Sequence, residues 1–242
     1  KKRITDYRFN GLVRRFLQSS TLKNDGSIHK NSCGTPQGGL MSPILANIYL
    51  DVVVDKWFIQ NYANYNNIIV RYADDAVFFF KKEDDAREFM LQFKTRIESY
   101  GLLLKSKENS FSFLGFTFYW GRQNKRQSLK IKTQKEKLYK GFKEFYEWIK
   151  ANRNKMRLKE IWNTTKSKLQ GHYNYFGFWM NRQKLVHYYN EVVKALFKWL
   201  NKRSQKKSYT WESFNRRLEF NPLPKPPEVN ELKKLGNNFG QI

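Results

Sequence analysis

The chain has 242 residues, and its 46 lysine and arginine side chains outnumber 21 aspartate and glutamate side chains, giving a formal net charge of +25. This surplus is untypical of an enzyme that acts on a neutral metabolite and indicates a polyanionic partner, while the 17% aromatic content excludes a disordered basic tail. A single cysteine, Cys33, excludes an intramolecular disulfide framework, and the three histidines show no metal-ligand spacing.

Helices and loops are predicted for the first 60 residues. Apolar residues at helical spacing favour a helix over residues 7–19, and the polar run 23–26 ends it. A loop rich in glycine and proline follows from Gly34 to Gly39. A second helix is expected from about residue 43 to 60, because Pro43 is tolerated in the first turn of a helix.

A β-hairpin is predicted next. Residues 67–70 and 76–80 are β-rich, and the acidic stretch between them is too short for anything but a turn. Phenylalanine and isoleucine recur every four residues over 83–100, which predicts a third helix. Strands are expected at 102–104 and 111–118.

Past residue 120 the pattern is typical of helices only. Three helices are predicted, at residues 134–150, 157–177 and 183–203. The last 22 residues contain four prolines, so we expect an extended tail on the surface. A domain boundary near 120–132 coincides with a change in charge, because residues 121–210 carry 24 basic and 5 acidic side chains, a surplus of 19.

Aromatic residues are interleaved with this charge, as at Tyr139–Lys140 and Lys198–Trp199. A solvated helix face would explain the charge alone, but phosphate neutralisation together with base stacking explains the mixture better. Trp199 has apolar neighbours and is expected in the core. The candidate phosphate contacts are Lys198, Lys202, Arg203, Lys206 and Lys207.

Asp74 and Asp75 are adjacent carboxylates in the predicted hairpin turn. Like charges side by side raise each other's pKa, and a divalent cation relieves the repulsion. Hard oxygen ligands suit Mg²⁺, and two such ions about 4 Å apart can activate a primer hydroxyl and steady a leaving pyrophosphate. Most isolated Asp-Asp pairs are surface turns, but the apolar flanks hold this pair at a sheet edge, so both residues are candidate catalytic and metal-binding groups.

Three stretches resemble one family of proteins. Tyr72-Ala73-Asp74-Asp75 resembles the YxDD box of reverse transcriptases. The 17 residues from Gly34 to Leu50 resemble the PQGG motif of bacterial group II intron proteins, and Phe113–Phe116 resembles the primer-grip strand that follows. Their order and spacing agree with the family, and residues 169–177 and 198–205 resemble its thumb or maturase region.

The resemblance implies an α+β fold. In the implied fold, residues 1–120 are the C-terminal part of a right-hand polymerase palm, an antiparallel sheet with packed helices. Residues 121–210 are an all-α, basic three-helix thumb or maturase domain that binds RNA, and residues 211–242 are a C-terminal extension. The implied activity is RNA-directed DNA synthesis on two Mg²⁺ ions held by Asp74 and Asp75. The implied primer grip is Leu114, Gly115 and Phe116, and the implied nucleotide pocket is Pro36, Gln37, Gly38, Gly39 and Tyr72.

Some residue roles stay open. Gln37 could instead cap the helix after the glycine-rich loop, and Tyr72 could be a buried strand residue. Lys105 and Lys107 compete for a lysine that the family usually has before the primer grip. Zinc-nuclease sequence is not seen, so DNA cleavage by this chain is not expected.

The family carries a further metal-binding aspartate on a strand well before the PQGG motif. Only 33 residues precede Gly34, and none resembles that strand. Asp51 and Asp55 lie four residues apart and are interpreted as ordinary helix-face charges, poor substitutes for it. We therefore expect either part of a larger or split polymerase, with its N-terminal part on the same or another chain, or a chain without autonomous catalysis.

The leading hypothesis is an RNA-directed DNA polymerase and maturase of group II intron type, whose partners are structured intron RNA, an RNA template, a DNA primer and deoxynucleoside triphosphates. The alternatives are an RNA-binding maturase or structural subunit without polymerase activity, and a reverse transcriptase of bacterial defence. No apolar run approaches the roughly 18 residues of a spanning helix, and the N-terminus lacks a signal-peptide core. A soluble protein of the bacterial cytoplasm, without a membrane partner, is expected.

Overall fold

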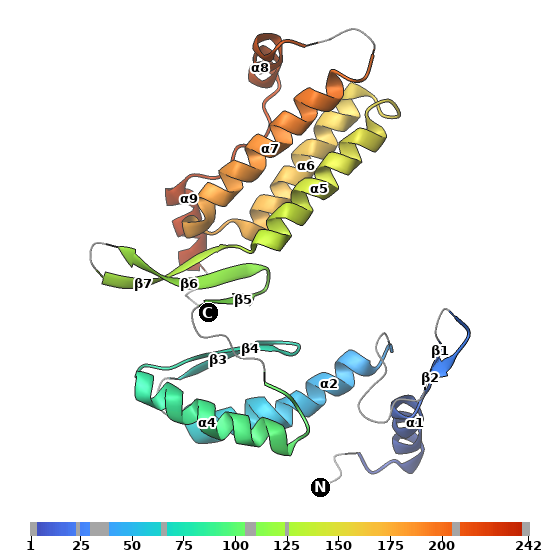
Figure 1. The fold of residues 1–242 in the computed structure, drawn as a ribbon, viewed down its shortest axis with the longest axis vertical. Coiled ribbons are helices and arrows are strands. Elements are labelled where there is room, and N and C mark those ends of the chain that lie inside the picture. The colour runs from blue at the N-terminus through green and yellow to red at the C-terminus, as the bar shows by residue number, and fades with distance from the viewer. Residues whose placement is uncertain are drawn as a thin grey trace. The chain divides into compact units, whose positions relative to one another are not determined.

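The computed structural model describes residues 4–22, 25–29, 39–63, 67–104, 110–123, 126–204 and 209–238. The chain divides into two compact units, Lys1–Ser106 and Lys107–Ile242. Figure 1 shows the helices and strands of both units.

The first unit begins with helix α1, Tyr7–Leu17. The Asp6 carboxylate caps it by accepting hydrogen bonds from the amides of Arg8 and Phe9 at 2.8 and 3.2 Å. Strands β1, Thr21–Leu22, and β2, Ile28–His29, follow as a small antiparallel pair. The predicted first helix is confirmed and ends two residues early.

The second predicted helix is confirmed over 42–62, with an irregularity that the sequence pattern did not indicate. It consists of α2, Ser42–Leu50, a π-helical segment η1, Asp51–Asp55, and α3, Lys56–Tyr62. A π turn displaces the backbone hydrogen bonding by one residue. The guanidinium of Arg96 supports this turn by donating to the Val53 carbonyl at 2.7 Å.

The predicted hairpin and third helix are also confirmed. Strands β3, Ile68–Tyr72, and β4, Asp75–Phe79, pair antiparallel, and α4, Glu83–Ser99, lies on the same side of them as α2 (Figure 1). Three acidic residues in the first turn of α4 stabilise the helix, because their negative charge interacts favourably with the positive N-terminal end of the helix dipole. The buried core of this unit is Val53, Val54, Phe58, Phe89, Phe93 and Ile97.

The second unit opens with a three-stranded antiparallel sheet of β5, Ser110–Phe113, β6, Phe116–Gln123, and β7, Arg126–Thr133. The prediction of one strand over 111–118 is wrong, because a tight turn at Leu114–Gly115 divides it. The prediction of helices only past residue 120 is also wrong. In β7, lysines alternate with apolar residues, so only one face of the strand is apolar. The strand therefore lacks the continuous apolar run by which a buried strand is recognised. Residues 102–104 belong to no strand.

The three predicted helices of the second unit are confirmed. They are α5, Lys135–Asn152, α6, Leu158–Phe176, and α7, Arg182–Leu200, which lie side by side in Figure 1. Their buried side chains form one core centred on Ile149, Ile161, Leu169, Leu185 and Leu196. Burial of a continuous apolar stripe on each helix stabilises the bundle.

The sheet belongs to this bundle, so the units divide between residues 106 and 107 and not near 120. Asn181, in the short 3₁₀ helix η3, Trp179–Asn181, accepts a hydrogen bond from the Thr133 amide at 2.8 Å. Its own amide donates to the Thr133 hydroxyl at 2.7 Å. Both residues are buried, so these bonds are shielded from water and tie β7 to the start of α7.

The prediction of an extended C-terminal tail is wrong in part. Helix α8, Trp211–Phe220, precedes the proline-rich stretch, and α9, Val229–Asn238, follows it. The extended stretch between them docks on the bundle, where the Trp162 indole donates to the Asn221 carbonyl at 2.8 Å. Leu223 and Leu232 are buried, so apolar burial anchors this segment.

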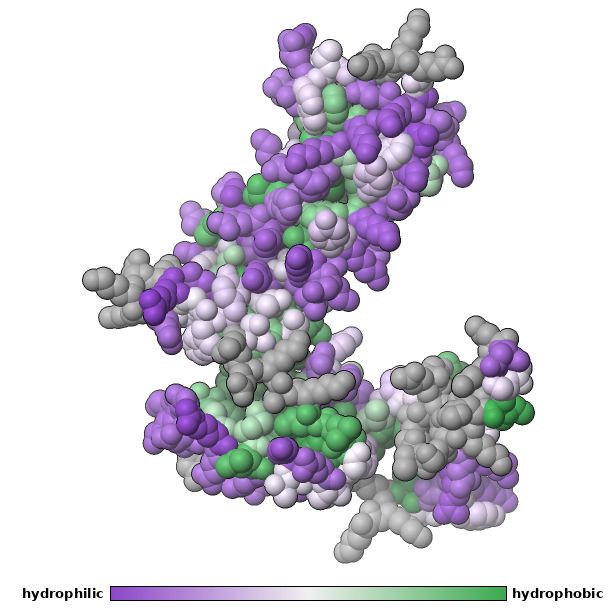
Figure 2. Space-filling model, viewed as in Figure 1, coloured by the Kyte–Doolittle hydropathy of each residue, from purple (hydrophilic) through white to green (hydrophobic). Residues whose placement is uncertain are grey.

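The surface in Figure 2 is mostly hydrophilic over the helices of the second unit. Among the described residues, no helix has the length and apolar content needed to cross a membrane.

Candidate active site

The acidic dipeptide lies at the tip of the β3–β4 hairpin. Tyr72 pairs with Asp75, so Ala73 and Asp74 form a two-residue turn. Ala73 has a φ of 54°, in the left-handed region that such tight hairpin turns require. Both carboxylates are exposed. The strands therefore present two adjacent negative charges to solvent at one end of the hairpin.

Arg71 braces this turn from the preceding strand position. Its Nη1 donates to the Ala73 carbonyl at 2.7 Å and to the Asn47 side chain on α2 at 2.8 Å. Its Nε and Nη2 donate to the Asp55 carboxylate at 2.8 and 2.6 Å. The Arg71 side chain is only 13% exposed, so this bidentate pair is screened less than a surface ion pair.

The Asp55 carboxylate raises the pKa of the Arg71 guanidinium, chiefly through the hydrogen bonds between them. The interpretation of Asp55 as an ordinary helix-face charge is therefore wrong, because it fixes the arginine that holds the turn. The sequence contained one signal of this pair. Arg71 interrupts a β-rich apolar run, and a cation in a half-buried strand requires a partner. What the sequence could not indicate was which acidic residue supplies it.

The two turn carboxylates fit a Mg²⁺ site in part. Mg²⁺ usually takes one or two protein carboxylates together with waters and substrate phosphates. Asp51 lies 2.5 Å from the Lys56 ammonium, and Asp55 is held by Arg71, so neither helix carboxylate is presented as a further free ligand. Within the described ranges, no three His, Cys, Asp or Glu side chains cluster as a metal site. Asp74 and Asp75 are thus the available donors.

The candidate nucleotide pocket is described only in part. Pro36, Gln37 and Gly38 lie outside the described residues, as do Lys105 and Lys107. The Gly39 carbonyl accepts a hydrogen bond from the Ser42 amide at 3.1 Å, where α2 begins. Tyr72 is 65% exposed, so the alternative of a buried strand tyrosine is wrong. Its side chain is accessible beside the two carboxylates.

The candidate primer grip is the β5–β6 turn of the second unit. Leu114 and Gly115 have φ values of 48° and 77°, the conformation of a two-residue hairpin turn. The Tyr175 hydroxyl, at the end of α6, donates to the Leu114 carbonyl at 3.1 Å, and the Gln134 amide donates to the Gly115 carbonyl at 2.9 Å. Phe116 contacts Phe176 edge to face. The helices thus hold the turn in place.

The predicted phosphate contacts at the end of α7 and in the turn that follows it already bind neighbouring groups. The Lys198 ammonium donates to the Tyr146 hydroxyl at 2.7 Å, and Lys202 lies 5.6 Å from the Trp199 ring centroid. Arg203 donates to the Met156 carbonyl at 2.9 Å. Lys198 and Lys202 are nevertheless exposed and remain open to a polyanion, whereas Lys206 and Lys207 lie outside the described residues.

Trp199 lies beneath these cations and is 8% exposed, as the sequence predicted. We expect Trp199→Ala to lower the free energy of unfolding by about 3 to 5 kcal/mol, because the cavity cannot fully collapse and because Arg153, 4.8 Å from the ring centroid, loses its aromatic partner. Urea unfolding followed by circular dichroism measures the loss. A change below about 1 kcal/mol would mean that Trp199 adds little to the core.

Residues 2–118 match the protein family described as reverse transcriptase (RNA-dependent DNA polymerase). This match covers the acidic turn, the glycine-rich loop and the primer-grip turn.

Two curated proteins are similar to shorter parts of the chain. The group II intron-encoded protein LtrA of Lactococcus lactis subsp. cremoris is 45% identical over 58 residues, which cover 24% of this chain and 9% of that protein. The putative COX1/OXI3 intron 1 protein of Saccharomyces cerevisiae is 40% identical over 67 residues, covering 28% of this chain and 8% of that protein. The matched segments thus span less than a tenth of each relative.

Proposed function

We propose that this chain, whose residues 2–118 belong to the reverse transcriptase family, works as an RNA-directed DNA polymerase and maturase of the group II intron type. The family match and the intron-encoded relatives confirm the resemblance predicted from the sequence. In this proposal the hairpin and helices of the first unit belong to a polymerase palm, and the helix bundle of the second unit is the thumb or maturase region.

The observation that carries the polymerase proposal is the acidic turn. Asp74 and Asp75 are exposed, adjacent and braced by Arg71. They would hold Mg²⁺. When bound, Mg²⁺ would supply the positive charge that activates a primer hydroxyl and steadies a leaving pyrophosphate.

The remaining roles belong to groups of the chain itself. Arg71 keeps the turn in one conformation, so the two carboxylates keep fixed positions. Tyr72 would offer its exposed aromatic side chain to the primer end, and the segment from Pro36 to Gly39 would line the pocket for the incoming deoxynucleoside triphosphate. The turn at Leu114–Gly115, whose backbone is held by Tyr175 and Gln134, would contact the primer strand as the primer grip that the resemblance implies.

The charge surplus of residues 121–210 supports a structured intron RNA as the partner of the helix bundle. The direct test of the whole proposal is template-dependent incorporation of deoxynucleotides, with Mg²⁺ and an RNA template, by the polymerase that contains this chain. RNA binding without any incorporation would favour the alternative of a maturase subunit that does not polymerise.

The basic end of α7 provides a salt-dependent test of RNA binding. Replacing Lys198, Lys202 and Arg203 with glutamine should weaken binding of a structured RNA and reduce the slope of log K against log salt by roughly 0.7 to 0.9 per lost phosphate contact. Fluorescence anisotropy at several salt concentrations measures the slope, and a melting curve checks that the fold persists. An unchanged slope would show that these residues are only a solvated face.

A further inference from the structure

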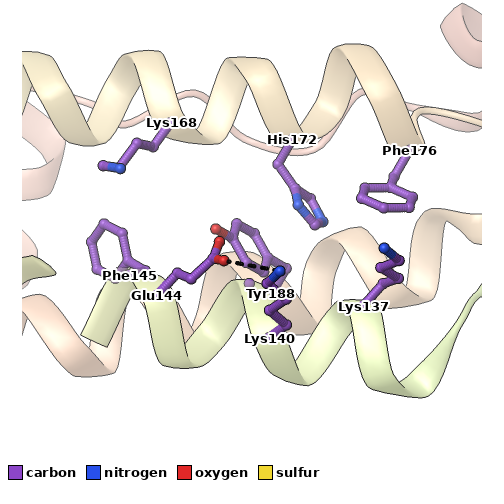
Figure 3. Close-up of a pocket in the computed structure, with 9 residues that line it drawn as sticks. Lys137, Lys140, Glu144, Phe145, Lys168, His172, Phe176 and Tyr188 are labelled. Atoms are coloured by element: carbon purple, nitrogen blue, oxygen red, sulfur yellow. Dashed lines mark ion pairs between the residues drawn. The ribbon is translucent and has the colours of Figure 1, made fainter. Parts of the chain in front are cut away.

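A pocket of about 390 Å³ lies among the three long helices of the second unit. Figure 3 shows its side chains. Lys168, His172 and Phe176 follow one another at four-residue intervals, so they share one face of α6. They point toward α5, which contributes Lys137 and Lys140.

The rim of the pocket is cationic. Lys137, Lys140 and Lys168 are exposed, and Glu144 is the carboxylate that lines the pocket with them. The Lys140 ammonium lies 3.8 Å from the Glu144 carboxylate, too far for a hydrogen bond. Three positive charges against one negative charge leave a surplus that attracts a phosphate.

The floor of the pocket is aromatic. The His172 ring stacks on Tyr188 with centroids 3.7 Å apart and an interplanar angle of 8°. Phe176 contacts the same histidine, with centroids 4.8 Å apart, and the buried Phe145 also lines the pocket. Aromatic surface beside a cationic rim suits a group that carries both a phosphate and a ring.

One polar atom of this floor lacks a partner. The Nε2 atom of His172 is buried and has no hydrogen bond to any described residue. Burial lowers the pKa of His172 to about 4, so the imidazole is neutral at pH 7. A buried polar atom without a partner costs free energy.

We propose that this pocket binds one unpaired nucleotide of RNA, with its phosphate among Lys137, Lys140 and Lys168 and its ribose or base against the floor beside His172. The inference rests on the proposed RNA-binding function of the second unit. The volume admits a single small ligand and not a base-paired helix. Extruded or loop nucleotides expose their bases, which makes them the part of a folded RNA that fits here.

The test uses the whole 242-residue chain and its three histidines, His29, His172 and His187. Their imidazole signals are followed by ¹³C NMR at pH 7 during titration with uridine monophosphate, uridine, inorganic phosphate, a ten-nucleotide oligouridine, and a ten-base-pair RNA duplex. We expect uridine monophosphate and oligouridine to shift the His172 signal saturably. His187 lies on α7 and does not line the pocket, so its signal should stay in place.

Two matched variants separate the pocket from general charge. Lys137→Gln/Lys168→Gln should weaken uridine monophosphate binding at least tenfold. Lys150→Gln/Lys159→Gln removes the same charge from exposed positions on α5 and α6 outside the pocket and should change it less than twofold. Melting curves of both variants should match that of the parent chain, because all four lysines are exposed.

Several results would overturn the inference. In the NMR titration, these results are a His172 signal that does not shift, His172 and His187 signals that shift equally, or a His172 shift with the duplex as large as that with oligouridine. In the binding measurements, they are equal affinities for phosphate and uridine monophosphate, or equal losses of affinity in the two variants. If structured RNA still binds with its usual salt dependence while His172 does not shift, the pocket is wrong and the proposed RNA-binding function stands.

Discussion

Replacing Asp74 or Asp75 with asparagine is expected to abolish primer extension by the polymerase that contains this chain. Asparagine keeps the size and loses the charge, so Mg²⁺ at the turn would lose a ligand. Bound metal contributes several kcal/mol of charge stabilisation to such a reaction. A loss of about 4 kcal/mol corresponds to a rate lower by about 10³-fold. Single-turnover extension of a labelled primer on an RNA template measures the loss.

The chain contains a matched control for this experiment. Asp84 and Asp85 are also adjacent, with Asp84 exposed and Asp85 partly buried, but they lie in the first turn of α4, where their negative charge only stabilises the helix N-terminus. Asp84→Asn and Asp85→Asn should extend primers at the parent rate, and RNA affinity should be unchanged in all four variants. Extension at the parent rate by both turn variants would exclude the acidic turn as the catalytic site.

The second large effect is expected at Arg71. Arg71→Lys keeps the positive charge but cannot reach Asp55, Asn47 and the Ala73 carbonyl together, because lysine lacks the planar fork of donors. The turn would lose its brace and the carboxylates their fixed positions. A displacement of about 1 Å can cost on the order of 10²-fold in rate. We expect kcat to fall by about that factor, the KM for deoxynucleotide to change little, and the Mg²⁺ concentration for half-maximal rate to rise.

A role in positioning is distinguished from a role in stability by three measurements. Asp55→Asn should reproduce the kinetic defect, and the double variant Arg71→Lys/Asp55→Asn should be no worse than the single ones, because all three changes break one interaction. Lys56→Gln, which removes the neighbouring Asp51 ion pair, should leave kcat unchanged. A kcat loss that follows the unfolded fraction in melting curves, with an unchanged Mg²⁺ requirement, would contradict positioning by Arg71.

Much of this molecule followed from local patterns in the sequence. Helical periodicity predicted α4 and the three bundle helices to within three residues at either end, and β-rich runs around the acidic pair predicted the hairpin that presents Asp74 and Asp75. These elements were predictable because each buries a stripe or face that its own residue order encodes. The motif resemblance added the family, which the comparisons confirmed.

Local patterns were wrong where distant contacts overrule them. The apolar run 111–118 looks like one strand, and only pairing of Phe113 with Phe116 shows the turn inside it. The proline-rich tail is predicted as an extended segment on the surface, and only the structure shows that it contains α9 and buries Leu223 and Leu232. The tail docks on partners far away in the chain, and the turn at Leu114–Gly115 is held by the Tyr175 hydroxyl, which donates to the Leu114 carbonyl. No short window of residues contains these partners.

The candidate site, too, was predictable from local sequence in one part and depended on the tertiary structure in another. Two adjacent carboxylates between apolar strands already indicate a metal-binding turn, because charge and periodicity are local properties. The partners that act on this turn are nonlocal: Arg71 could pair with any acidic residue, and only the folded helix brings Asp55 to within 2.6 Å of it. The pocket around His172 likewise exists only because three helices pack together, since its rim and floor come from segments far apart in sequence.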